Sequence, residues 1–189
     1  MRRQLVVMVK EPRPGRVKTR LGRDIGHTRA AWWFRHQCRR LLRELDDPRW
    51  HLVLAVSPDR AGLESRVWPG HLPRRAQGAG DLGARMARVF RTAPPGQVII
   101  VGADIPAIRR HHIERAFALL GRHDAVVGPA TDGGYWLIGL ARRRAVPAPL
   151  FEGVRWSTRH ALADTLAGLK GLSVAFVDQL HDVDTAKDL

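Results

Sequence analysis

Short apolar runs of strand length alternate along this chain with segments in which apolar residues recur every three or four positions. The alternation begins with an unbroken β-forming run at residues 4–9 and ends with another at 172–177. Strands that are apolar on both faces are typical of a parallel sheet covered by helices on both sides. The sequence therefore predicts an α/β fold, namely a three-layer α/β/α sandwich around a central, mostly parallel sheet.

Individual elements follow from the same periodicity. The expected strands are runs rich in β-branched and aliphatic residues: 4–9, 51–56, 97–101, 124–127, 135–140 and 172–177. The expected helices are 29–45, 81–92, 108–120 and a helix capped by Ser157 or Thr158 that runs to Leu169. No linker-like stretch or internal repeat interrupts the 189 residues, so we predict one domain, residues 1–189.

The net charge of +14 raises the question of nucleic-acid binding. The cations are almost all arginines and are scattered through every segment rather than gathered into one stripe, which argues against a nucleic-acid partner. A basic, non-catalytic module that binds RNA or a protein stays open as an alternative of another class. It predicts steeply salt-dependent binding.

The remaining composition points to an ordinary globular protein. Cys38 is the single cysteine, lies in an amphipathic stretch and is expected to be a small core residue. The N-terminal apolar run is too short for a signal peptide and no run is long enough to span a bilayer, so we expect a cytoplasmic protein without a membrane span. Six tryptophans, including Trp32, Trp33 and Trp68, suggest a homodimer surface.

The loop after the first strand is strongly basic and stiffened by proline. Pro14 and Gly15 stand at its centre, and five cations fall within eleven residues: Lys10, Arg13, Arg16, Lys18 and Arg20. Phosphate oxygens are bound by such mobile ammonium groups, guanidinium forks and exposed backbone N–H groups. Ligands of open α/β sheets bind beyond the carboxyl ends of the strands, where this loop lies. We expect an anion site here, although the loop lacks the glycine of a Walker A motif.

Two carboxylate motifs are candidates for a metal site. Asp104 follows the most hydrophobic strand within Gly-Ala-Asp-Ile-Pro, and Asp182 and Asp184 lie on one side of an extended segment near the C-terminus. Hard oxygen ligands of this kind suit Mg²⁺ or Mn²⁺, which bind one or two carboxylates together with substrate phosphates. Helix capping is the alternative for Asp104 and for Asp184, and spacing does not choose between Asp182 and Asp184.

Two glycine-rich segments are further candidates. Residues 77–83 contain a literal G-x-G-x-x-G, but no buried first strand precedes it, so a dinucleotide site is not expected, and Gln77 and Gly80 become candidates for contact with a nucleotide base or ribose. The turn at 131–135 presents Asp132, Gly133, Gly134 and Tyr135, and Ser157 and Thr158 open a later helix. These last residues are candidates for binding an acceptor molecule.

Five motifs in one order carry a family resemblance: the basic loop, residues 102–106, the run DGGYWLIGL (132–140), Trp-Ser-Thr (156–158) and the closing DVDTAKDL (182–189). Together they resemble a bacterial family of uncharacterised glycosyltransferase-like proteins with the GT-A nucleotide-diphospho-sugar transferase fold, over the chain from Leu5 to Leu189. More distantly, the chain resembles phospholactate guanylyltransferase and the guanylyltransferase of molybdenum cofactor assembly.

The resemblance implies a nucleotide held over the first loop, with Lys18 and Arg20 facing its phosphates and Gly15 beneath them. It also implies that Asp104 is the metal aspartate and that Asp182 or Asp184 is the second ligand. Two departures stand out: the loop lacks the G-x-G-T-R run of nucleotidyltransferases, and Ala186 stands where the closing motif usually has proline.

These observations favour a Mg²⁺-dependent transferase that uses a nucleotide donor. The leading hypothesis is nucleotidyl transfer, in which Lys18, Arg20 and Asp104 act on a nucleoside triphosphate and a small phosphorylated or carboxylated acceptor attacks its α-phosphate. Five cations are more charge than a nucleoside diphosphate needs, which is the reason to prefer this to the alternative, glycosyl transfer from a nucleotide-sugar. The sequence names neither the base nor the acceptor.

Overall fold

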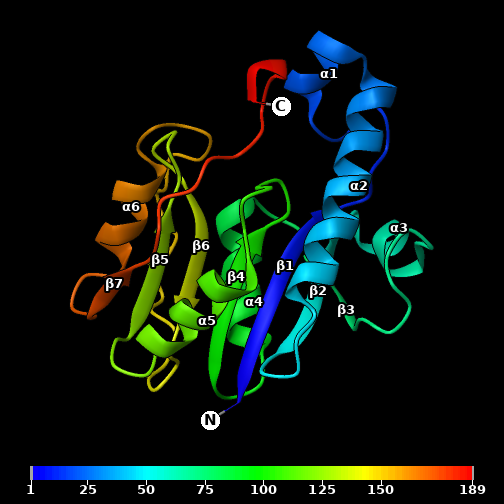
Figure 1. Ribbon diagram of the computed structural model, residues 1–189. Helices are drawn as coiled ribbons and strands as arrows, with labels where there is room; N and C mark the ends of the chain where they lie inside the picture. The colour runs from blue at the N-terminus through cyan, green and yellow to red at the C-terminus, as the bar shows by residue number, and fades with distance from the viewer. Residues whose placement is uncertain (1, 189) are drawn as a thin grey trace.

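The computed structural model describes residues 2–188 and contains a seven-stranded sheet with the order β3-β2-β1-β4-β6-β5-β7 (Figure 1). Its strands are β1 (Arg3–Lys10), β2 (His51–Ser57), β3 (Arg74–Ala76), β4 (Gln97–Gly102), β5 (Ala125–Pro129), β6 (Tyr135–Leu140) and β7 (Val174–Phe176). The helices are α1 (Thr19–Ile25), α2 (His27–Leu45), α3 (Asp59–Glu64), α4 (Leu82–Thr92), α5 (Arg110–Leu119), α6 (Ala161–Gly168) and the 3₁₀ turn η1 (Ala186–Asp188).

One strand makes the sheet mixed. β6 runs antiparallel to both of its neighbours, β4 and β5, while every other pairing in the sheet is parallel. The reversal arises because β5 and β6 are joined by the short turn at 130–134 rather than by a crossover helix. The predicted α/β sandwich with a mostly parallel sheet is therefore confirmed.

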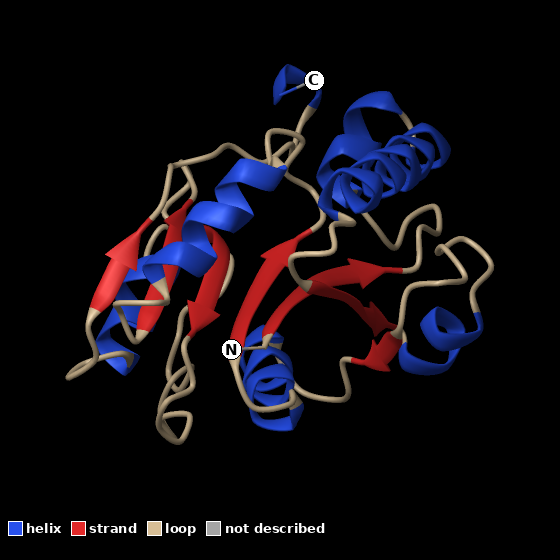
Figure 2. Ribbon diagram, turned by 60° about the horizontal axis from the view of Figure 1, so that its bottom comes forward, coloured by secondary structure: helices blue, strands red, loops and turns tan. Residues whose placement is uncertain are grey.

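Helices cover both faces of the sheet (Figure 2). Successive side chains of β1 point to opposite sides, so Leu5, Val7 and Val9 pack in the core that includes α2 and α5, whereas Val6 packs in the core that includes α4 and α6. Continuous apolar strands were predicted for this reason. Because β1 and β4 pair in parallel, their carboxyl ends meet at one edge of the sheet, beneath α1 and the C-terminal segment (Figure 1).

Four short elements were not predicted: α1, α3, β3 and η1. β3 is a three-residue edge strand that carries two arginines, so it lacks the apolar run expected of a buried strand. The prediction that Ser157 or Thr158 caps a helix is wrong, because α6 begins at Ala161 after His160. Ser157 has φ +59°, a left-handed conformation, whereas an N-cap residue typically has an extended one.

Other predictions concern burial. Cys38 is fully buried in the core, as expected, and its pKa is raised, chiefly by burial. Trp68 is also buried, so it cannot belong to a dimer surface, whereas Trp32 is 63% exposed. Among residues 2–188, no helix combines the length and the hydropathy that a bilayer crossing requires.

Candidate active site

The basic loop leaves the carboxyl end of β1 and returns into α1 through two residues with left-handed backbones. Gly15 has φ +72°, a conformation that favours glycine, and nothing lies within 4 Å of where its Cβ would be, so backbone strain rather than space selects glycine there. Lys18, the residue that precedes α1, has φ +44°. This second turn directs the Lys18 side chain inward, and it is only 6% exposed, whereas Arg16 and Arg20 lie on the surface.

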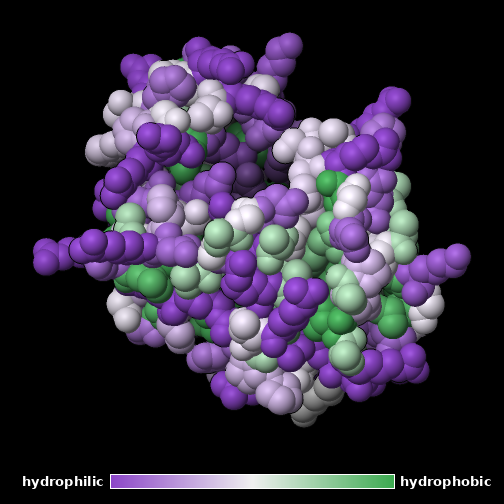
Figure 3. Space-filling view, turned by 180° about the vertical axis from the view of Figure 1, so that it is seen from behind, coloured by the Kyte–Doolittle hydropathy of each residue, from purple (hydrophilic) through white to green (hydrophobic). Residues whose placement is uncertain are grey.

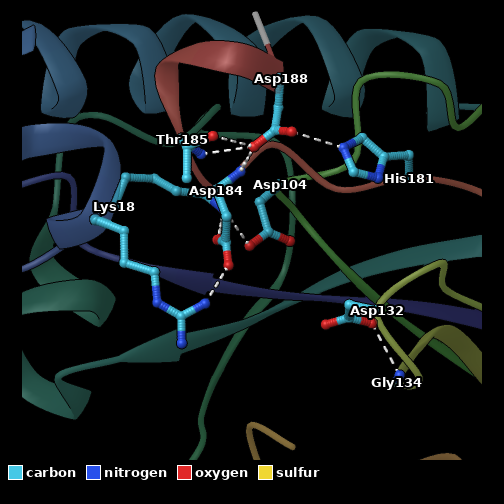
Figure 4. Close-up of polar contacts among 9 residues, drawn as sticks. Lys18, Asp104, Asp132, Gly134, His181, Asp184, Thr185 and Asp188 are labelled. Atoms are coloured by element: carbon cyan, nitrogen blue, oxygen red, sulfur yellow. Dashed lines mark hydrogen bonds and ion pairs between the residues drawn. The ribbon is translucent and has the colours of Figure 1, made fainter. Parts of the chain in front are cut away.

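The buried ammonium of Lys18 joins the two carboxylate motifs that the sequence singled out (Figure 4). Its Nζ lies 2.8 Å from Asp104 Oδ2 and 3.1 Å from Asp184 Oδ1. Arg20 Nη1 donates to the other Asp184 oxygen at 2.7 Å. Burial acts to lower the pKa of Lys18, but the two carboxylates outweigh burial and the pKa is raised. Lys18 is therefore charged at neutral pH and is held between two carboxylates.

The C-terminal segment delivers Asp182 and Asp184 from the far end of the sequence. It pairs with the end of β5 through an Ala130–Leu180 bridge, and the Val183 N–H then donates to the Asp104 carbonyl at 3.3 Å. Val183 is buried, whereas both aspartates line the crevice. Because alternate residues of an extended segment face the same way, this path turns both carboxylates toward Asp104.

A chain of side-chain contacts fixes this segment to the turn between β5 and β6, and Figure 4 shows the part of it that joins His181, Asp188 and Thr185. His181 Nδ1 lies 2.7 Å from Thr131 Oγ1, and His181 Nε2 lies 3.0 Å from Asp188 Oδ1. Asp188 also accepts from the Thr185 N–H and hydroxyl. Sequence reasoning missed His181 and Asp188, although both lie in or beside the closing motif, because their role depends on a turn 50 residues away.

Carboxylates outnumber cations around Asp182. Burial raises the pKa of Asp182, and the nearby carboxylates of Asp184, Asp104 and Asp132 raise it further, while Lys18 acts in the opposite direction. Within residues 2–188 no three acidic, histidine or cysteine side chains are close enough together to form a ready-made metal site. These carboxylates nevertheless fit a divalent cation. Their hard oxygens already surround the Lys18 ammonium, and the charge of Lys18 does not neutralise all of them.

The turn at 130–134 is built around its glycines. The Asp132 carboxylate accepts from the Gly134 N–H at 2.8 Å, and Gly133 has φ +86°. A Cβ on Gly133 would lie 2.4 Å from the Arg159 carbonyl oxygen, so the turn packs directly against the segment before α6. Asp132 thus faces the crevice from the side opposite Lys18 (Figure 4).

Other residues predicted to bind the acceptor molecule already form hydrogen bonds within the protein. The Tyr135 hydroxyl accepts from the Thr165 hydroxyl at 3.3 Å, and burial raises the pKa of Tyr135. The Thr158 hydroxyl donates to the Arg155 carbonyl at 2.7 Å. Ser157 and Thr158 line the crevice, but in an irregular turn and not at a helix N-terminus.

Gln77 and Gly80, which the sequence suggests as contacts for a nucleotide base or ribose, support the local structure. Gln77 is buried, and its Nε2 donates to the carbonyls of Val9 and Ala55, which ties together the ends of β1 and β2. Gly80 does not line the crevice; it lies in the loop that leads to Asp81, whose carboxylate caps α4 by accepting from the Ala84 N–H. Both residues therefore shape the wall beside α4.

One cavity of about 590 Å³ joins these parts. Figure 3 shows from behind that the molecule is hollowed near its top and that hydrophilic side chains surround the hollow. Most residues predicted for the site line the cavity: Lys10, Arg16, Lys18, Arg20, Gln77, Asp104, Asp132, Gly134, Tyr135, Ser157, Thr158, Asp182 and Asp184. Pro14, Gly15, Gly80 and Gly133 shape the adjoining backbone without lining it.

Apolar side chains complete the wall, and sequence reasoning did not assign them to the site. Met8, Leu82, Met86 and Trp156 all line the cavity, and Leu82 is 45% exposed. The cations that line it all come from residues 10–20. The cavity therefore has a cationic rim beside α1, a carboxylate centre and an apolar wall.

The chain is similar to several known proteins. Residues 41–158 match the model of the family described as "Uncharacterized protein conserved in bacteria (DUF2064)". A crystal structure from Desulfovibrio desulfuricans G20, described as a "putative nucleotide-diphospho-sugar transferase", is 33% identical and superimposes with a TM-score of 0.89 over 98% of this chain and 84% of that chain. Rv0371c from Mycobacterium tuberculosis H37Rv, solved in complex with manganese, shares the fold at 17% identity, with a TM-score of 0.55 over 100% and 95% of the two chains.

Two curated relatives match part of the chain. A 2-phospho-L-lactate guanylyltransferase from Methanocaldococcus vulcanius is 29% identical over 105 residues, which is 54% of this chain and 46% of that protein. A 3-phospho-D-glycerate guanylyltransferase from Phenylobacterium zucineum is 33% identical over 94 residues, 49% of this chain and 41% of that protein. The chain thus spans less than half the length of these two relatives.

Proposed function

The chain belongs to the bacterial DUF2064 family, and from this membership and the geometry of the crevice we propose that it is a metal-dependent nucleotidyltransferase. The donor is a nucleoside triphosphate and the acceptor is a small phosphorylated or carboxylated molecule. The observation that carries the proposal is the meeting of the basic loop with Asp104 and Asp184 in one cavity. The partial similarity to two guanylyltransferases supports the same reaction class.

Binding of a metal–triphosphate complex would replace the ion pairs that the free protein forms in the crevice. Lys18 and Arg20 now neutralise the carboxylates of Asp104 and Asp184. A triphosphate offers the two cations new oxygen partners, and a divalent cation offers the carboxylates a new positive partner. Binding of both together leaves no buried charge unpaired, whereas binding of either alone would break contacts without replacing them.

Asp104, with Asp184 or Asp182, would hold Mg²⁺ or Mn²⁺. When bound, such a cation supplies positive charge to the phosphate oxygens, which lowers the cost of the charge that develops during transfer. The manganese complex of the related fold is consistent with this choice of ion.

In the proposed reaction an acceptor oxygen forms a bond to the α-phosphorus of the triphosphate, and the bond from that phosphorus to the β-phosphate bridging oxygen breaks. Pyrophosphate leaves with the electron pair of that bond. Lys18, Arg16 and Arg20 stabilise the negative charge of the departing pyrophosphate, and an acceptor that is already ionised needs no general base. Positioning and charge stabilisation account for most of the catalysis.

A second candidate, glycosyl transfer from a nucleotide-sugar, is favoured by the acceptor side of the cavity. The cations lining the cavity belong to residues 10–20, whereas Asp132 faces the cavity from the side opposite Lys18 and Trp156 adds an aromatic ring to the lining. A lining that offers a carboxylate and an aromatic ring suits a neutral, hydroxylated molecule better than a phosphate or carboxylate. The charge of the first loop still places nucleotidyl transfer first.

Thermal-shift titration with each nucleoside triphosphate, UDP-sugars and GDP-sugars, with and without Mg²⁺, tests the proposal. We expect a Mg²⁺-dependent shift with one triphosphate in the wild type, and its loss in Asp104→Asn. Asp46→Asn is the matched control, because that carboxylate is exposed and pairs with His71 away from the cavity.

Unchanged triphosphate and Mg²⁺ binding in Asp104→Asn would show that the metal assignment is wrong. A larger Mg²⁺-dependent shift with a nucleotide-sugar than with any triphosphate would reverse the order of the two candidates.

A further inference from the structure

A second cavity, of about 460 Å³, lies between α2 and the loop that connects β4 to α5. We call it the α2 cavity; its lining includes Gln37, Arg40, Arg43, Glu44 and Arg109, together with the apolar side chains of Leu41 and Ile108. It shares no lining residue with the candidate active site. The α2 cavity is therefore a separate feature of the surface.

The guanidinium groups of this cavity are not neutralised by acids. Within residues 2–188, Arg40, Arg43 and Arg109 form no ion pair. Arg40 Nη2 donates to the Pro106 carbonyl at 3.0 Å, and Arg109 Nη1 donates to the Pro106 and Ile108 carbonyls at 2.6 and 2.9 Å, which uses only part of their N–H groups. The one acid of the lining, Glu44, is already engaged as the acceptor of the Arg110 N–H at 3.0 Å.

A buried amide adds an independent observation. Gln37 is 7% exposed, lines the cavity and has no hydrogen-bond partner for its Nε2. A buried NH₂ group without an acceptor is unfavourable, because it has lost water and gained nothing in return. The Nε2 atom itself is shielded in this side-chain position, and rotation of the amide toward the adjoining cavity would let a ligand oxygen supply the missing acceptor. Surface arginines are common in this chain, and the Gln37 amide is what distinguishes this group of them.

We propose that the α2 cavity binds a small phosphorylated molecule through its phosphate group. Three guanidinium groups and one amide offer donors from several directions, which suits the several acceptor oxygens of a phosphate. The volume exceeds what a phosphate ion fills, which leaves room for an organic remainder. The phosphate group is common to inorganic phosphate and to a phosphate monoester, and the two sources are distinguished by titration.

The test is a residue-resolved NMR titration of the full-length protein with inorganic phosphate and, separately, with glycerol 3-phosphate, at constant ionic strength set with chloride. Residue resolution is needed because the first loop of the active site is expected to bind phosphate as well. We expect the Gln37 side-chain amide and the Arg40 and Arg43 Nε–H signals to shift and to saturate. Tighter binding of glycerol 3-phosphate than of phosphate would identify the organic monoester as the source, and equal binding would identify the free ion.

Paired arginine variants on the same helix provide the control. Arg40→Gln/Arg43→Gln should weaken the binding reported by Gln37 by about tenfold or more, because each guanidinium–phosphate contact is charge-assisted. Arg35→Gln/Arg39→Gln removes equal charge from exposed positions of α2 outside the cavity and should leave the affinity within about twofold. Equal weakening in both variants, or shifts that match those with chloride and never saturate, would overturn the proposal.

Discussion

Replacing Lys18 by methionine should have opposite effects on the binding of a divalent cation alone and on the binding of a metal–nucleotide complex. Lys18 Nζ lies within 3.1 Å of both Asp104 and Asp184, so it would lie beside any cation that those carboxylates bind. Methionine keeps most of the side-chain length and removes the charge. The carboxylates then repel one another until a cation binds.

The size of the metal effect follows from Coulomb's law. An ammonium and a divalent cation that share the same carboxylates would lie about 4 Å apart, where a pair of unit charges interacts by about 1 kcal/mol in water and about 4 kcal/mol at an effective dielectric constant near 20. The divalent charge doubles these values. The carboxylate side chains are 37% exposed, so the aqueous end of the range applies. Removal of Lys18 should therefore tighten Mg²⁺ binding by about 2 kcal/mol, or about thirtyfold.

Nucleotide binding should change in the other direction. If Lys18 transfers from the carboxylates to the phosphates, its loss removes a charge-assisted contact, and affinity for the metal–triphosphate complex should fall by about tenfold. The melting temperature of Lys18→Met should also depend more strongly on Mg²⁺ than that of the wild type, because the unpaired carboxylates destabilise the metal-free protein.

Isothermal titration with Mn²⁺ or Mg²⁺, and then with the complex, measures both effects, and Lys170→Met serves as a control that removes the same charge from an exposed site. Equal metal affinity in the wild type and in Lys18→Met would refute the idea that lysine and metal compete. A parallel loss of both affinities would indicate that Lys18 only supports the local fold.

Two predictions concern stability. Asp47→Asn should cost about 2 kcal/mol of unfolding free energy at pH 7, because hydrogen bonds from the Arg49 side chain lower the pKa of the buried Asp47 carboxyl to about 2. That stabilisation is present above the unfolded pKa of about 3.9 and disappears as the pH falls toward 2. The unfolding free energies of the variant and the wild type, measured with urea, should therefore converge near pH 2. The control variant Asp46→Asn, at an exposed carboxylate, should have nearly the stability of the wild type at every pH. Gly133→Ala should destabilise more than Gly153→Ala in thermal unfolding, since both have positive φ but only the Gly133 Cβ would strike backbone; equal losses would mean that conformation alone matters.

The strands of the central sheet could be predicted from the sequence because their burial on both faces requires unbroken β-forming runs. The prediction for 135–140 agrees with β6 at both ends, and that for 4–9 differs from β1 by one residue at each end. Short elements escaped prediction because a two-turn helix or an edge strand buries too little surface to require a recognisable periodicity of apolar residues. The start of α6 was misplaced because Ser157 and Thr158 have the chemistry of caps, whereas Ser157 has a left-handed backbone and α6 begins at Ala161.

The basic loop and Asp104 could be assigned to one edge from strand order alone, because residues that follow parallel strands gather at their carboxyl ends. Asp184, the partner of Lys18, could not be found locally, since 166 residues separate the two side chains. Their meeting depends on how the C-terminal segment crosses the sheet edge, and that path is set by tertiary contacts.

The choice between Asp182 and Asp184 shows the same limit more sharply. Spacing makes the two carboxylates equivalent, because residues two apart in an extended segment face the same side. Their surroundings differ: Lys18 and Arg20 neutralise Asp184, whereas burial and neighbouring carboxylates raise the pKa of Asp182. The difference arises from which loop lies over each residue. The Ala130–Leu180 bridge helps to fix the path of this segment, so two chemically identical side chains acquire different surroundings from contacts that their motif does not contain.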